Sequence, residues 1–264
     1  MQKLLGYALA FGAGISTAKL LQWFPVANQH QHQHQHGEQT PGSKMTMKGR
    51  ILDMGARMAG HFAPINSIHQ HVCGFHFYSG ELNRQLIAHH YCSHINQDVR
   101  QCVIYDSDRA DARLIGIEYI ISEKIFNQLP PEEKKLWHSH VYEVKSGELI
   151  TPGVPDIAEK EVMKELINTY GKTFHTWQID RGDTIPLGVP QLMMAFLQDG
   201  QINEDLVRQR DEYYKVSTED KKRQRADIEP PKDTHGADAW SKSGKAVQLT
   251  TSESKMKTTK WSLF

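Results

Sequence analysis

LIAHHYCSHINQDVRQCVIY, residues 86–105, is the stretch from which the fold follows most directly. Apolar and aromatic side chains fill residues 86–95 and 99–105, and the polar triplet at 96–98 separates the two runs. Two such runs joined by a short polar turn predict a β-hairpin. Residues 82–95 also place apolar side chains four apart, as a helix would. The turn and the β-rich run that follow favour the strand.

Further strands are expected beyond this hairpin. Residues 113–121 (RLIGIEYII) are β-branched and aromatic, which is typical of a central strand. Strands are also expected at 138–144, 173–180 and 191–197, and helices at 156–170, 204–214 and 217–226. Short turns and single helices between strands, without regular alternation, predict a single α+β domain over residues 50–228. Its sheet is expected to be mainly antiparallel, with flanking helices.

Composition excludes several classes of function. The chain has 264 residues with 39% hydrophobic and 23% charged, which suits one substantial domain with appendages. Its formal net charge is zero, so no nucleic-acid partner is expected. It carries no glycine-rich phosphate loop and no dinucleotide fingerprint, so no nucleotide cofactor is expected. Its three cysteines are too few for a disulfide framework. Cys92 and Cys102 would bridge if they lie opposite each other across the hairpin; otherwise all three cysteines are reduced or inert.

The N-terminal residues 1–27 carry an apolar run at 4–18 that follows Lys3. A helix that spans a bilayer needs roughly 20 apolar residues, and this run is shorter and ends in the small residues 16–18. It is therefore predicted to be a secretory signal peptide. Alternatively, residues 20–25 lengthen it into an uncleaved membrane anchor. Either reading predicts an exported protein, periplasmic or extracellular, or a membrane-anchored one.

Polar segments flank the predicted domain. Residues 28–49 are rich in His and Gln and are expected to be a disordered linker. Its four alternating histidines would collect divalent metal incidentally. Residues 50–70 place apolar side chains three to four apart, which predicts a short amphipathic helix that ends at Pro64. Residues 229–264 are expected to be a disordered polar tail.

Imidazole and thiol side chains cluster in the segments AHHYCSH (88–94) and WHSHVYE (137–143). On a strand His90, Cys92 and His94 share one face, but the two histidines lie about 13 Å apart, too far for one ion. His138 and His140 share a face about 7 Å apart. The sequence thus predicts a site for zinc or another divalent transition metal, formed by Cys92 and one neighbouring histidine with His138 and His140. In a helix His90 and His94 would instead lie one turn apart and act together.

Other residues on predicted strands are candidates to complete this site. Glu118, His175 and Asp180 are placed to add a ligand or a base. Glu143 would face away from the histidine pair if its segment is a strand. The alternative without metal is that these histidines are half-buried, bonded to the backbone or stacked on aromatic rings. No residue is assigned a catalytic role, and both an enzyme and a binding protein fit the pattern.

Six motifs in order link the sequence to a known family: HHYCSH (89–94), RQCVIYD (100–106), LWHSHVYEV (136–144), PGVP (152–155), YGKT (170–173) and LGVPQLMM (187–194). Over residues 65–228 the chain resembles the oil body-associated protein family. Plant members associate with seed oil bodies, so the resemblance implies a lipid- or membrane-associated accessory protein of unknown molecular activity. The alternative is a metal-binding protein or metal-dependent enzyme. The apolar N-terminus and the His-rich linker depart from the plant members and favour export or tethering over a lipid-body surface. The resemblance identifies no catalytic residue and leaves the protein partners unknown.

Overall fold

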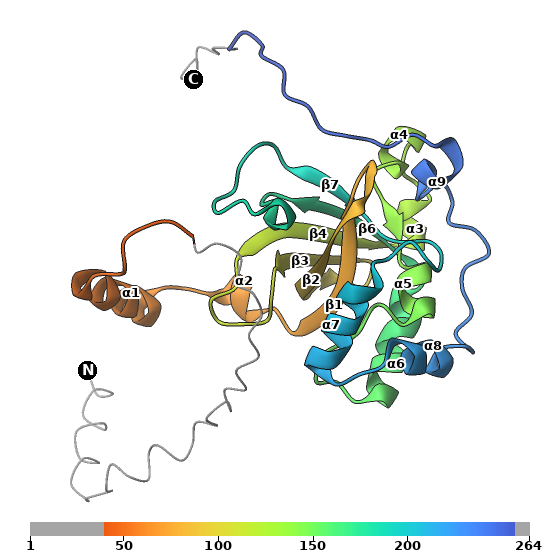
Figure 1. Ribbon diagram of the computed structural model, residues 1–264, viewed down its shortest axis with the longest axis horizontal. Coiled ribbons are helices and arrows are strands. Elements are labelled where there is room, and N and C mark those ends of the chain that lie inside the picture. Colours follow the sequence, from red (N-terminus) through yellow and green to blue (C-terminus); the bar gives the residue numbers. More distant parts are fainter. Residues whose placement is uncertain (1–39, 257–264) are drawn as a thin grey trace, which may run out of the picture. The chain divides into compact units, whose positions relative to one another are not determined.

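The computed structural model of this chain describes residues 40–256 (Figure 1). The signal peptide or anchor predicted at residues 1–27, and the first part of the linker predicted at 28–49, lie outside the described residues. Within residues 40–256, every helix is too short or too polar to cross a membrane.

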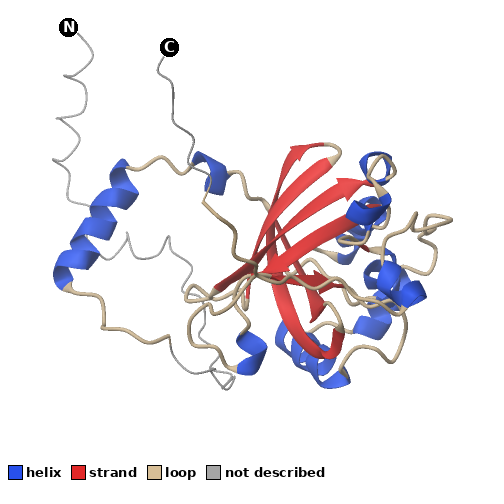
Figure 2. Cartoon of the chain, turned by 90° about the horizontal axis from the view of Figure 1, so that it is seen from above, coloured by secondary structure: helices blue, strands red, loops and turns tan. Residues whose placement is uncertain are grey.

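Six antiparallel strands close into a barrel (Figure 1, Figure 2). The strands are β1 (Gln70–Tyr78), β2 (Glu81–Asn96), β3 (Val99–Tyr105), β4 (Leu114–Ser122), β6 (Thr169–His175) and β7 (Gln191–Met194). They pair in this order, and β7 returns to β1. The short strand β5 (His138–Ser139) pairs with β6 on the same edge as β7. The antiparallel α+β arrangement agrees with the prediction, and the closed barrel is more specific than that prediction.

Helices surround the barrel unevenly. Their bounds are α1 (Met47–Ala59), α2 (Ala63–Asn66), α3 (Glu123–Phe126), α4 (Pro131–Lys134), α5 (Val141–Ser146), α6 (Asp156–Leu166), α7 (Glu204–Tyr214), α8 (Thr218–Gln224) and α9 (Ala239–Ser243), with a 3₁₀ turn at Ile179–Arg181. Helices α5, α6 and α8 lie on one side of the barrel (Figure 1). The amphipathic helix predicted within residues 50–70 is present as α1, but it begins at Met47, inside the predicted linker, and ends at Ala59 before Pro64 is reached.

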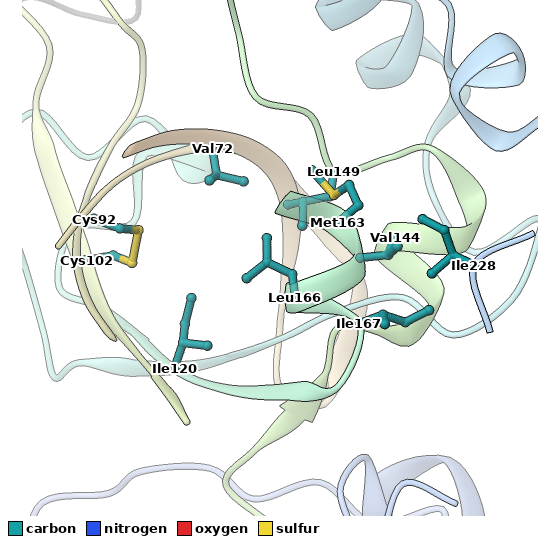
Figure 3. Close-up of a cluster of buried hydrophobic side chains, with 10 residues drawn as sticks. All are labelled: Val72, Cys92, Cys102, Ile120, Val144, Leu149, Met163, Leu166, Ile167 and Ile228. Carbon is teal, nitrogen blue, oxygen red and sulfur yellow. A yellow bond between two sulfur atoms is a disulfide. The ribbon is translucent and has the colours of Figure 1, made fainter. Parts of the chain in front are cut away.

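The predicted hairpin is confirmed as β2 and β3. Cys92 lies directly opposite Cys102 in the register, and the two form a disulfide. Both cysteines belong to a buried hydrophobic cluster (Figure 3). In Figure 3 the two cysteines and Ile120 of β4 lie on the barrel wall, and all three face Leu166 of α6 across the cluster. The cluster therefore joins the barrel wall to the helices.

Breaking this disulfide should destabilise the protein. The two cysteines are 10 residues apart, and closing a loop of that length in the unfolded chain is worth about 2–3 kcal/mol. We expect the midpoint of urea unfolding to fall when a reductant is present. The double variant Cys92→Ala/Cys102→Ala is the control, because its midpoint should not respond to reductant. Equal midpoints for the natural chain with and without reductant would contradict the expectation.

Strand β1 is buried on both faces, and its residues 72–78 (VCGFHFY) accordingly show no clear alternation of polar and apolar side chains. Phe75 and Phe77 point outward and pack in one cluster with Val207 of α7 and Trp240 of α9. His76 points the other way and lines an interior cavity. A strand covered on both sides is a nearly continuous apolar run, which periodicity alone does not distinguish from a helix.

The strand predicted at 138–144 is wrong beyond Ser139. Only His138 and Ser139 pair with β6, and the chain then enters α5. Gly147 ends that helix with φ of +85°, a left-handed conformation that favours glycine. The β-branched and aromatic residues of this segment suit a strand locally, but burial of Val144 against the cluster of Figure 3 outweighs that preference.

The polar tail predicted to be disordered at 229–264 is also wrong in part. Ala237 and Asp238 are buried, and the Asp238 carboxylate accepts a hydrogen bond from the Ser139 N–H at 3.1 Å. Trp240 packs edge-on against Phe77. The tail thus makes one specific contact to β5 and one to β1, although its composition is polar.

Candidate metal centre

The carboxylate of Glu118 lies at the centre of a buried group of imidazoles. Its Oε1 atom is 3.3 Å from His138 Nε2 and 3.4 Å from His140 Nε2. Its Oε2 atom is 3.1 Å from His90 Nε2. All four side chains are almost fully buried. With bonds of 2.0–2.1 Å, two ligands of a tetrahedral ion lie about 3.3–3.4 Å apart, which matches the two Oε1 distances.

Strand register puts these groups on one interior face. Cys92 shares a face with His90 and pairs with Cys102, and Cys102 pairs with Glu118. On the other side of β2, His90 pairs with Val72, which shares a face with His76. His76, His90 and Glu118 therefore converge from three different strands, and their ligand atoms lie within 4.8 Å of one another.

The last two imidazoles enter from the segment after α4. Pairing of β5 with β6 places His138 opposite Gly171, and His140 follows as the N-cap residue just before α5. At Gly171 the missing side chain is essential. A Cβ atom there would lie 2.1 Å from Glu118 Oε1 and 2.5 Å from His138 Nε2. The glycine leaves the space in which the carboxylate and the imidazole meet.

Hydrogen bonding fixes which nitrogen of His140 faces the carboxylate with a lone pair. The Thr169 hydroxyl donates to the Leu166 carbonyl at 2.7 Å, so it accepts from His140 Nδ1–H at 2.8 Å. In the neutral ring Nε2 then carries a lone pair, 3.4 Å from Glu118 Oε1. Two lone pairs facing each other repel unless a proton or a cation lies between them. A hydrogen bond from the other ring nitrogen, like the one from His140 to Thr169, is what orients the histidines that bind metals in proteins.

Two more imidazoles have nitrogens with no aligned partner. Among the described residues, neither ring nitrogen of His90 or His138 makes a hydrogen bond of good geometry, although Glu118 is close to both rings. A buried polar atom left without a partner costs about 1–3 kcal/mol. A bound ion would satisfy the Nε2 atom of each ring, which is the nitrogen that faces Glu118 and is a common metal ligand.

Charges in the site favour a cation. Burial acts to raise the pKa of Glu118, but the surrounding imidazoles outweigh it and hold the pKa well below its usual range. Burial lowers the pKa of His76 and of His140, so both are neutral near pH 7. Burial also opposes the charged form of His138, but the neighbouring carboxylate more than offsets this and raises the pKa. The set is an ionised carboxylate with imidazole ligands, a combination that suits zinc and related ions.

A small cavity of about 20 Å³ adjoins the carboxylate. Its polar lining comes from His76, His90, Glu118, His140 and Glu143, with Gln70 and with Arg100, whose guanidinium is paired with Glu165. The rest of the lining is apolar and belongs to the cluster in Figure 3. This volume holds one water-sized molecule. Burial raises the pKa of Glu143 to about 8, so that carboxyl is protonated at neutral pH.

Three of the five predicted metal ligands meet at this centre: His90, His138 and His140. Cys92 does not contribute a thiolate, because its sulfur is bonded to Cys102. His94 is exposed, with its ring stacked on His69 at a centroid distance of 5.3 Å. Four residues along a strand from His90, it lies too far away to share an ion.

Residues other than the five predicted ligands also form the candidate metal centre. Of the three candidates to complete the site, Glu118 is its centre, and His175 Nε2 lies 3.2 Å from His76 Nδ1. Asp180 is instead paired with Arg84 at 2.7 Å. The sequence reasoning missed His76 because residues 72–78 showed no clear period. It also misplaced Glu143, which the helix α5 turns toward the cavity.

The fold and the site together define a class of protein. It is a small antiparallel barrel that encloses a carboxylate and several imidazoles. The family described as "Protein of unknown function (DUF1264)" matches residues 62–229, and the chain belongs to this family. Oil body-associated protein 1B of Arabidopsis thaliana is 47% identical over 195 residues, which are 74% of this chain and 81% of that protein. Oil body-associated protein 1A of Zea mays is 46% identical over 198 residues, 75% of this chain and 82% of that protein. No solved structure matches the chain.

Proposed function

We propose that this protein associates with the surface of lipid bodies as an accessory protein. Its relatives in Arabidopsis thaliana and Zea mays carry names that refer to oil bodies. The observation that carries the proposal is the exposed apolar face of α1, which has the chemistry of a helix that lies on a lipid surface. The apolar run predicted as a signal peptide or anchor at residues 1–27 would be a separate means of export or tethering.

Helix α1 has an apolar stripe and buries no side chain. The stripe consists of Met47, Ile51, Met54 and Met58, which are 56–84% exposed. At 100° per residue these four positions fall within one narrow sector of the helix. Keeping such an apolar stripe in water is energetically unfavourable. Its exposure therefore supports an apolar binding partner for α1.

The charges around the stripe favour an anionic lipid surface as that partner. Helix α1 carries three basic residues, Lys48, Arg50 and Arg57, against one acidic residue, Asp53. A basic polar face beside an apolar stripe is the pattern of helices that lie in a lipid interface. Each basic residue near an anionic lipid surface contributes about 1 kcal/mol of attraction.

Two neighbouring substitutions in α1 test this proposal. Ile51 lies within the stripe and Leu52 lies about 100° around the helix, yet they are 56% and 61% exposed. Burying an aliphatic side chain in lipid is worth about 1.5–3 kcal/mol. We therefore expect Ile51→Ser to reduce flotation with phospholipid-coated triacylglycerol droplets by about tenfold or more, and Leu52→Ser to have a much smaller effect.

Both variants keep the apolar run at residues 4–18, so the difference between them reports α1 alone. Neither side chain is buried, so the thermal midpoints should equal that of the natural chain. Droplets without anionic phospholipid should recover less protein. Equal flotation of the two variants, or none by the natural chain, would argue against the proposal.

A second function, binding of a divalent transition metal, is favoured by the convergence on Glu118. The candidate ions are zinc and iron(II), because two histidines and a carboxylate occur both in catalytic zinc sites and in non-haem iron sites. Of the residues here, Glu118 would bring the negative charge, and His138 and His140 would bring neutral nitrogen ligands. This proposal concerns binding and assigns no reaction.

Metal content should depend on this centre and not on surface histidines. The chain would carry His30, His32, His34 and His36 replaced by Gln, because that tract is expected to collect divalent metal by itself. We expect His138→Ala/His140→Ala to lose the bound metal. The matched control is His69→Ala/His94→Ala, which should retain the metal. These two exposed histidines contact each other where His69 precedes β1 and His94 lies near the end of β2. Elemental analysis after reconstitution measures both, and absence of metal from the parent chain would refute the proposal.

A further inference from the structure

The candidate metal centre contains two sets of ligands that share one residue. Glu118 forms one group with His138 and His140, and another with His76 and His90. Its two oxygens are divided between them. The Oε1 atom faces His138 and His140, and the Oε2 atom faces His90 at 3.1 Å. A carboxylate placed in this way presents a separate lone pair to each side.

One ion does not account for both sets. Two ligands of one ion with bonds near 2.1 Å lie at most about 4.2 Å apart, on opposite sides of the ion. Within each set the ligand atoms lie within 4.8 Å of one another, but the two sets form separate groups at that distance. A single ion at Oε1 would also leave both nitrogens of His90 without an aligned partner.

The second set has its own orienting contact. His76 Nδ1 lies 3.2 Å from His175 Nε2, and both rings are buried. When His76 Nδ1–H donates to His175, His76 Nε2 carries the lone pair that a metal requires. This arrangement parallels the bond from His140 to Thr169 on the first set. Each set thus has a histidine with one ring nitrogen held by a neighbouring side chain.

We propose that the barrel holds a pair of divalent transition-metal ions bridged by Glu118, which extends the metal binding proposed above and rests on it. One ion would be bound by Oε1, His138 and His140. The other would be bound by Oε2, His76 and His90. Paired ions in proteins commonly lie about 3.5–4 Å apart. The adjoining cavity of about 20 Å³ has room for one oxygen ligand, such as water, on the pair.

Half-site variants test the pair. In the full chain with His30, His32, His34 and His36 replaced by Gln, and stripped by a chelator, we expect zinc titration to give two ions per chain. His76→Asn/His90→Asn should retain one ion, and His138→Asn/His140→Asn should retain the other. His69→Asn/His94→Asn should still bind two. Manganese(II) loaded in place of zinc should give the electron paramagnetic resonance signal of a coupled pair, and each half-site variant should give that of an isolated ion.

The outcomes separate this inference from the proposed metal binding. One ion in the parent chain, lost with His138→Asn/His140→Asn, would overturn the pair while leaving metal binding intact. No ion would overturn both. Two ions without magnetic coupling, or two that persist in both half-site variants, would place them elsewhere and overturn the pair. Circular dichroism of the stripped variants shows whether the fold is kept. If a half-site variant unfolds, the coupled signal of the parent chain decides the matter alone.

Discussion

Glu118→Gln should abolish the stabilisation of this protein by divalent metal. Free metal at about 1,000 times its dissociation constant raises the free energy of unfolding by about 4 kcal/mol when only the folded chain binds. Glutamine keeps the shape of the side chain but loses the negative charge that faces three imidazoles. We expect the natural chain to gain this stability on addition of zinc and the variant to gain almost none, as measured by urea unfolding.

Glu143→Gln is the matched control for that experiment. Glu143 is buried and lines the same cavity, but in the metal-free protein burial raises its pKa to about 8 and keeps it protonated at neutral pH. Replacing a neutral carboxyl with a neutral amide should leave the response to metal largely intact. If Glu118 only pairs with the histidines as a structural carboxylate, Glu118→Gln would instead destabilise equally with and without metal.

Gly171→Ala should be among the most damaging single substitutions in the barrel. The added Cβ would lie 2.1 Å from Glu118 Oε1 and 2.5 Å from His138 Nε2, so both groups must move. Overpacking of this kind typically costs about 1–3 kcal/mol. We expect urea unfolding to show a loss of that size, and bound metal to be lost with it, because the carboxylate can no longer meet His138.

Gly74→Ala provides the comparison within the same barrel. Gly74 is a buried strand glycine, and a Cβ there would lie 2.9 Å from Leu149 Cδ1, the flexible end of a side chain. Rotation of Leu149 should relieve that contact, so a smaller loss of stability and normal metal content are expected. A cost at Gly171 no larger than the cost at Gly74 would show that the space at Gly171 is not essential.

Local pattern accounts for much of the fold. The hairpin of β2 and β3 follows from two apolar runs around a polar turn, and the central strand β4 from its β-branched residues. The same reasoning failed at 138–144, where strand-forming residues enter α5 after Ser139. The secondary structure of that segment is decided by its burial against α6 and the barrel. Packing of this kind leaves no periodic pattern in the local sequence.

For the candidate metal centre, too, some features follow from the sequence and others only from the tertiary structure. The sequence by itself determined that His90, Cys92 and His94 share a strand face, and that the two histidines stand too far apart for one ion. It also determined that Cys92 and Cys102 would bridge if they met across the hairpin, and they do. Only the tertiary structure decided that Glu118 is the shared ligand and that His76 joins it. His76 and His175 lie 99 residues apart, and Glu118 meets His140 across 22. Closure of the barrel between β4 and β6, with β5 added beside β7, creates these contacts, and no short-range pattern encodes a pairing between distant strands.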